Sequence, residues 1–170
     1  MGFPGSSGGP MYLKGFEQVM SNLNKEIKGI VARSTSGLVH AVYFIRTQTE
    51  TKYPKTPVDY GNLRSSWFVT APDGIKKGNN PTFIGPKSGI YSTDHVKMLN
   101  ESQGVVAMNS SAFKKIVMFG YSVNYAGFIH EMIVAQHFTR KQSDIKWLEV
   151  HINNNTKALL EIIRKHAVIK

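Results

Sequence analysis

The chain has 170 residues, of which 41% are hydrophobic and 19% charged, a composition that suits one compact domain with a hydrophobic core. It contains no cysteine, which excludes disulfides and cysteine-ligated zinc. No run of about 18 apolar residues is present, and no basic region precedes an apolar block at the start, so we expect neither a membrane span nor a secretory signal.

The formal net charge of +10 is typical of proteins with a nucleic-acid partner. The excess is spread evenly, however, with net charges of +3 over residues 11–53, +4 over 54–140 and +3 over 141–170. A dedicated DNA-reading protein more often concentrates its charge in a tail or a basic run. We therefore do not expect sequence-specific nucleic-acid binding, while non-specific contact with DNA passing nearby stays open.

Residues 1–10 contain four glycines and two prolines and cannot build a packed element. They are expected to form a flexible N-terminal arm. It is either a disordered tail or a segment that orders only against a neighbouring subunit, with Phe3 as the one bulky apolar anchor. Residues 11–170 are expected to form a single α+β domain.

Residues 12–51 carry the clearest periodicity. Apolar positions recur in eight steps over 29 residues, close to the helical repeat, at Phe16, Met20, Leu23, Ile27, Ile30, Ser34, Leu38, Ala41 and Ile45. This stripe predicts a long helix that packs on a sheet. Gly29 and the cluster at 34–37 are weak helix formers, so a break or kink is expected at one of them.

Residues 54–66 are expected to form a corner. Pro54 and Pro57 push the preceding residues out of the helical region, so the helix must end near 51–53. Gly61 tolerates backbone angles that a side chain would forbid. Asp59 can accept a hydrogen bond from a following amide, and Arg64 is near enough in sequence to pair with it.

After the corner, residues 67–70 predict a first strand and Pro72 to Gly74 a turn. Residues 74–111 are rich in turn-forming residues and are expected to be a loop insertion with one or two short strands and a helical turn at 96–101. Such a loop either has no functional role or contacts a neighbouring ring or subunit.

Residues 112–121 predict the strongest strand, with Phe113, Val117, Phe119 and Tyr121 on one face. A C-terminal helix is expected over 144–165, capped by Ser143, with Asp144 at its positive end. Residues 153–155 are three asparagines and weaken its middle. The resulting fold class is α+β, with an antiparallel sheet covered on one face by the N-terminal and C-terminal helices.

The sequence offers no catalytic constellation, and we expect neither an enzyme nor a cofactor. Nucleotide-binding loops, dinucleotide fingerprints and His-Glu-x-x-His are absent. The nearest approach to a metal or acid–base set is His130 and Glu131 with His137. Their spacing does not support ligand geometry, and the preferred interpretation is that Glu131 pairs with a basic neighbour at a subunit edge. His40, His95, His151 and His166 are solitary in the sequence.

Three segments resemble one known family. Residues 57–64, Pro-Val-Asp-Tyr-Gly-Asn-Leu-Arg, follow a long amphipathic helix and resemble the Pro-Val-Asp-x-Gly-x-Leu-Arg signature of small head–tail junction proteins of tailed bacteriophages, the tail completion or neck proteins. The family commonly has Thr in place of Tyr60. Residues 124–131 resemble its Tyr-Ala-x-x-x-Glu segment, although four residues rather than three separate Ala126 from Glu131. Residues 144–165 match its last helix, with 145–148 replacing a Pro-Phe-Leu-Arg-Pro type opening.

The resemblance implies a structural protein of the virion. Such a protein would be assembled in the host cytoplasm into a ring, a hexamer by analogy, that joins the head connector to the tail tube or tail terminator and leaves a bore for DNA. The alternatives are a tail terminator ring, a basic DNA-binding accessory protein, and a hydrolase using His130 and Glu131. The resemblance carries structural rather than catalytic roles to Thr56, Pro57, Val58, Asp59, Gly61, Leu63, Arg64, Tyr125, Ala126 and Glu131.

Overall fold

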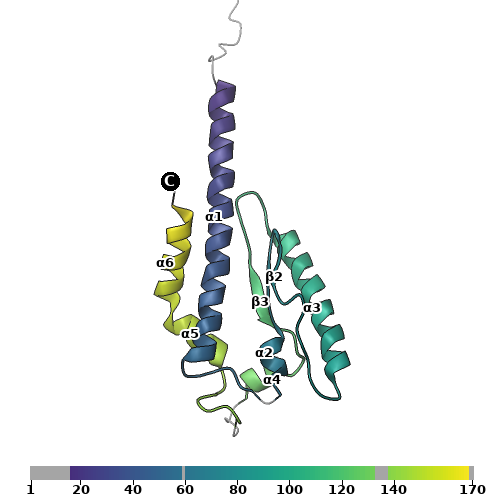
Figure 1. Ribbon diagram of the computed structural model, residues 1–170. Coiled ribbons are helices and arrows are strands. Elements are labelled where there is room, and N and C mark those ends of the chain that lie inside the picture. The colour runs from purple at the N-terminus through teal and green to yellow at the C-terminus, as the bar shows by residue number, and fades with distance from the viewer. Residues whose placement is uncertain (1–15, 59, 133–137, 169–170) are drawn as a thin grey trace, which may run out of the picture.

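A computed structural model describes residues 16–58, 60–132 and 138–168. The chain is α+β, as the sequence predicts, and its elements lie in successive layers (Figure 1). The long N-terminal helix α1 (Phe16–Thr51) lies between α6 (Thr156–Ala167) and a three-stranded sheet. A further helix, α3 (Ser88–Asn109), covers the other face of that sheet. The arm at 1–10 lies outside the described residues. None of the described helices is long and apolar enough to cross a membrane.

Helix α1 is continuous over 36 residues, so the expected break near Gly29 or residues 34–37 is wrong. Thr35 donates its hydroxyl to the Val31 carbonyl within the helix (2.9 Å) and is buried. At Gly37 a Cβ would lie only 3.0 Å from the Ile163 Cα, so the glycine lets α6 approach closely. Tertiary packing therefore outweighs the weak intrinsic preference of these residues. The end of α1 at Thr51 confirms the proline argument.

The apolar stripe of α1 is buried only in part. Val39, Ala41, Val42 and Ile45 belong to the core, whereas Val19, Met20 and Leu23 are 63%, 40% and 50% exposed. The helix packs against α6, α5 (Trp147–Asn154) and β1 (Trp67–Ala71) rather than on the sheet alone. Its N-terminal part extends past α6 (Figure 1). The prediction that the stripe packs on a sheet is therefore wrong for this part of the helix.

The sheet has the order β2-β1-β3 and is antiparallel throughout. The pairing of β1 with β2 (Gly74–Lys77) confirms the predicted turn, and a register irregularity falls between Val69 and Thr70. Strand β3 covers only Met118–Tyr121, shorter than the expected 112–121, and Phe113 is 79% exposed. Every residue of the central strand β1 is buried, because α1 and α3 cover opposite faces.

Residues 74–111 are not the loop insertion that their turn-forming composition predicts. They form β2 and the 22-residue helix α3. Its buried face consists of His95, Leu99, Ser102 and Val106, which have helical spacing but include two polar side chains. His95 is held by Ser122 (Nδ1 to Oγ, 2.6 Å) and donates from Nε2 to the Gly78 carbonyl. Because half of this face is polar, the hydropathy pattern of the sequence does not reveal the helix. As a result, the sequence predicted an open sheet face where the structure has α3.

The C-terminal segment forms two helices, α5 and α6, which meet at Asn155. The break falls within the asparagine run. Ser143 and Asp144 do not cap the helix as expected: α5 begins at Trp147 after Lys146, whose φ is +51°. Ser143 instead contacts the Thr56 carbonyl, and Asp144 accepts a hydrogen bond from the Tyr53 hydroxyl, which raises the pKa of Tyr53.

Candidate functional site

The corner between α1 and the sheet brings together the segments that resemble the phage family. After α1 the chain turns at Pro54 and enters the short helix α2 (Asn62–Ser65), which leads directly into β1. Gly61 precedes α2 with φ +86°, which confirms the predicted need for glycine. Asp59 lies outside the described residues, so its expected pairing stays a prediction.

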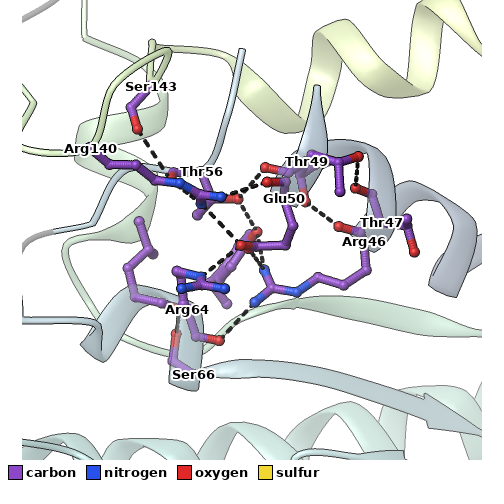
Figure 2. A network of polar contacts seen from close by, with 12 residues as sticks. Arg46, Thr47, Thr49, Glu50, Thr56, Arg64, Ser66, Arg140 and Ser143 are labelled. Atoms are coloured by element: carbon purple, nitrogen blue, oxygen red, sulfur yellow. Dashed lines mark hydrogen bonds and ion pairs between the residues drawn. The ribbon is translucent and has the colours of Figure 1, made fainter. Parts of the chain in front are cut away.

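A polar network ties this corner to the end of α1 (Figure 2). Its centre is the carboxylate of Glu50, which is 16% exposed and faces three arginines. The Nε of Arg64 lies 2.7 Å and the Nη1 of Arg140 lies 3.0 Å from Glu50 Oε2, and the Nη1 of Arg46 lies 3.0 Å from Oε1. Three guanidinium groups therefore converge on one carboxylate from three parts of the chain.

The arginines also bind backbone and aromatic groups, which fixes their positions. Arg46 donates to the Tyr121 hydroxyl (2.8 Å) and to the Arg64 carbonyl (3.1 Å), and its guanidinium lies 5.1 Å from the Trp67 ring centroid. Arg140 donates to the carbonyls of Thr56 (3.1 Å) and Glu50. Arg64 pairs with Glu50, a partner that the sequence did not predict.

Thr56, the first residue of the corner motif, is fully buried in this network. Its amide donates to the Thr49 carbonyl (2.8 Å), and its hydroxyl lies 3.0 Å from the Tyr121 hydroxyl. The motif thus joins the last turn of α1 to β3. We name the set Arg46, Glu50, Thr56, Arg64, Tyr121 and Arg140 the corner network.

The other side of the same corner is apolar. Leu63 is buried with Val123, Ala126 and Trp147 in one core cluster. Tyr125 packs edge-on against Tyr91, with ring centroids 5.7 Å apart. The two motif segments, 56–64 and 125–131, therefore meet across this cluster. The second segment includes the short helix α4 (Ala126–His130).

An open groove with a volume of about 700 Å³ lies over this cluster. We name it the corner groove. Motif residues Pro57, Val58, Gly61, Leu63 and Tyr125 contribute to its lining. The remaining lining residues are Tyr60, Asn62, Ile84, Gly85, Pro86, Lys87, Tyr91, Phe128, Ile129, Met132, Phe138 and Thr139. The motif therefore builds both the corner network and the corner groove.

Glu131 lies at the exposed edge of α4 and has basic neighbours, as expected. Its Oε1 accepts a hydrogen bond from His130 Nδ1 (2.6 Å), and Lys146 Nζ lies 3.6 Å from Oε2. The bond from His130, followed by the charge of Lys146, lowers the pKa of Glu131. Glu149 and then Glu131 raise the pKa of Lys146. Whether this edge faces another subunit stays a prediction.

The expected acid–base or metal candidates are only partly described. His130 packs edge-on against Trp147, with centroids 4.8 Å apart, and His137 lies outside the described residues. Among the described residues, no group of three or more His, Asp or Glu side chains has a geometry that could hold a metal. Two of the histidines that looked solitary, His40 and His166, stack on each other between α1 and α6 at 4.6 Å.

Glu50, Arg46 and Arg140 were missed by sequence reasoning. Glu50 lies 14 positions before Arg64 and 90 before Arg140, so no local spacing links them. The only sequence signal is that Glu50 is the last acidic residue before the prolines of the corner.

Comparisons of the chain with models of known protein families, with characterised proteins and with solved structures find no match.

Proposed function

We propose that this chain is a structural protein of a tailed bacteriophage, a tail completion or neck component that assembles as a closed ring between the head connector and the tail tube. The observation that carries the proposal is the convergence of its family-like motif segments at one corner. There Leu63 of the first segment packs in one core cluster with Ala126 of the second, although more than 60 positions separate these residues in sequence. A catalytic motif would be expected to present reactive side chains, whereas this motif joins a helix to a sheet.

Two surfaces suit contacts between subunits. The N-terminal part of α1 extends past α6 and carries the exposed apolar side chains Val19, Met20 and Leu23, and the corner groove lies near the opposite end of that helix. Different patches at opposite ends of one molecule favour a heterologous interface, which gives a ring when the rotation between subunits closes. Sixfold symmetry is the number that the resemblance implies.

The mass of the purified chain in solution tests the ring. We expect a closed oligomer by native mass spectrometry and sedimentation, with a central hole in electron micrographs, and the same collar at the head–tail junction of virions. A chain that stays monomeric at about 100 μM, well above the Kd of stable protein assemblies, would overturn the proposal.

A DNA-binding accessory protein is the second candidate, because the net charge is +10. Binding of a labelled duplex at low micromolar concentration, weakening steeply with salt, would favour it. Absence of binding at low salt would remove it. For the hydrolase alternative, the double variant His130→Ala, Glu131→Ala should leave virion yield unchanged if the protein is structural, and a loss of yield with normal ring assembly would support a catalytic role.

A further inference from the structure

The corner groove is a preformed apolar surface that is open to solvent. Its floor includes Leu63, which is 4% exposed, and its rim includes Tyr60, Ile84 and Phe128, which are 69%, 57% and 71% exposed. Large apolar side chains gathered on a rim are typical of an interaction surface rather than of ordinary scattered exposure.

The rim is held in place by the core. The buried side chain of Asn62 donates from Nδ2 to the Ile84 carbonyl (2.9 Å) and accepts from the Ile84 amide (2.8 Å). These two hydrogen bonds hold residues 84–87 of the rim against α2. A groove that needs no rearrangement binds its partner without the cost of ordering its walls.

The chemistry of the groove favours an uncharged, proline-containing segment. Lys87 is the only charged side chain among its described lining residues, and tyrosines, phenylalanines and prolines supply much of the wall. Grooves lined by aromatic rings bind extended segments in the polyproline II conformation. Residues 2–10 of this chain carry no charged side chain and include Phe3, Pro4 and Pro10.

The other apolar candidate in the chain fits less well. The exposed side chains Val19, Met20 and Leu23 lie on a helix that also carries Glu17 and Lys25. Seating that helix would bring charges to a groove wall that offers only Lys87. Charge therefore favours residues 2–10 as the occupant.

A chain cannot place Phe3 in its own groove. Helix α1 has 36 residues and is about 54 Å long, and the groove lies beyond its C-terminal end. Phe3 precedes the start of α1 by 13 residues, which span about 40 Å as polyproline II. Even fully extended they reach about 45 Å, which falls short of the groove.

We infer that the corner groove binds residues 2–10 of a second copy of this chain, with Phe3 seated among its aromatic side chains. Donor and acceptor then lie at opposite ends of α1, so each copy gives its arm to one neighbour and receives the arm of another. This inference rests on the proposed assembly of copies and names the contact that links them.

Disulfide trapping tests the contact directly, because the chain has no cysteine of its own. The double variant Gly2→Cys, Ile84→Cys keeps Phe3 and places one thiol in the arm and one on the rim. Mild oxidation should give a covalent ladder of dimer, trimer and higher species on a non-reducing gel, since bridging requires Cα atoms within about 7 Å. The matched control is Gly2→Cys, Met108→Cys, whose second thiol replaces an 87% exposed side chain on α3, outside the groove.

Adding Phe128→Glu to the first pair should reduce the cross-linked fraction about tenfold, because a charge would replace an apolar rim contact. Val105→Glu, at a 46% exposed position of α3, should leave it unchanged. Equal urea midpoints for both additions establish that folding is intact.

Several outcomes would overturn the inference. One is a disulfide within a single chain without any ladder, and another is an equally strong ladder from the Met108 control. A third is the absence of a cross-link in a protein that forms rings. The last is trapping of Val19→Cys with Ile84→Cys when the arm pair is not trapped. A single covalent dimer band, from a protein whose mass in solution is that of a dimer, would support the arm contact while overturning the ring. The experiments thus distinguish the absence of the arm–groove contact from the absence of the proposed ring.

Discussion

The two sides of the corner, the corner network and the corner groove, are built by the same short stretch of chain but differ in how they are completed. In the network, Glu50 and three arginines find their partners within the molecule, and each is at least partly covered. In the groove, Tyr60, Ile84 and Phe128 are exposed although the floor beneath them is core. One side therefore fixes the angle between helix and sheet, whereas the other leaves apolar side chains exposed and is the side that we propose binds a partner.

The largest expected effect concerns the groove floor. Leu63→Ala should lower the free energy of unfolding by about 3 kcal/mol, because it leaves a cavity among Val123, Ala126 and Trp147. Urea denaturation followed by circular dichroism measures it. Ile84→Ala, on the 57% exposed rim, should cost under about 0.5 kcal/mol. Equal costs would erase the distinction between floor and rim.

The next effect concerns the centre of the network. Glu50→Gln should lower the free energy of unfolding by about 2 kcal/mol, because three guanidinium groups lose their common counter-charge. The control Glu101→Gln breaks an exposed pair with Lys97 and should cost under about 0.5 kcal/mol. If the two variants unfold at the same urea concentration, the network does not stabilise the corner.

Gly61 lies between the two sides. Gly61→Val should lower the free energy of unfolding by about 1.5 kcal/mol, or prevent ring closure, because its φ of +86° is strained for a β-branched residue. A Cβ there meets no atom within 4 Å, so the cost arises from the backbone and not from a clash. Gly89→Ala, in α3 and equally free of contacts, should instead stabilise the protein by up to about 1 kcal/mol. A soluble, ring-forming Gly61→Val protein of normal stability would contradict this account.

The smallest effect concerns the edge beside the groove. The pKa of Glu131 is lowered by His130 and Lys146, so its ionised form is favoured in the folded state. The stabilisation is therefore complete above the ordinary pKa of a glutamate, about 4.3, and is lost as the pH falls through the lower folded-state pKa. Melting temperatures between about pH 5 and pH 3 should fall less in Glu131→Gln than in the native protein. Parallel curves would show that the edge contributes nothing.

Part of the fold could be predicted because its causes are local. Proline restricts the residue before it, which placed the end of α1, and the aromatic and β-branched residues from Trp67 to Thr70 placed β1. Turn chemistry predicted that Gly61 has backbone angles that favour glycine, and its φ is +86°. The helix α3 was missed because half of its buried face is polar, and His95 is satisfied only by Ser122 and Gly78 from other elements.

Less of the candidate site could be predicted. Leu63, Ala126 and Tyr125 were named from the resemblance, and they contribute to one cluster and the groove over it. Glu50 and Arg140 were not named, because contacts across 90 positions leave no periodic signal in the sequence. The groove itself arises from three separate segments that meet only in the folded chain.

The sequence by itself determined the class of fold, the long first helix and the glycine at the corner, because backbone sterics and apolar periodicity act over a few neighbouring residues. Tertiary structure alone decided that α1 stays straight, that α3 covers the second face of the sheet, and that Glu50 gathers three arginines. These features depend on burial and on charges from distant parts of the chain, whose energies exist only once the elements have packed together.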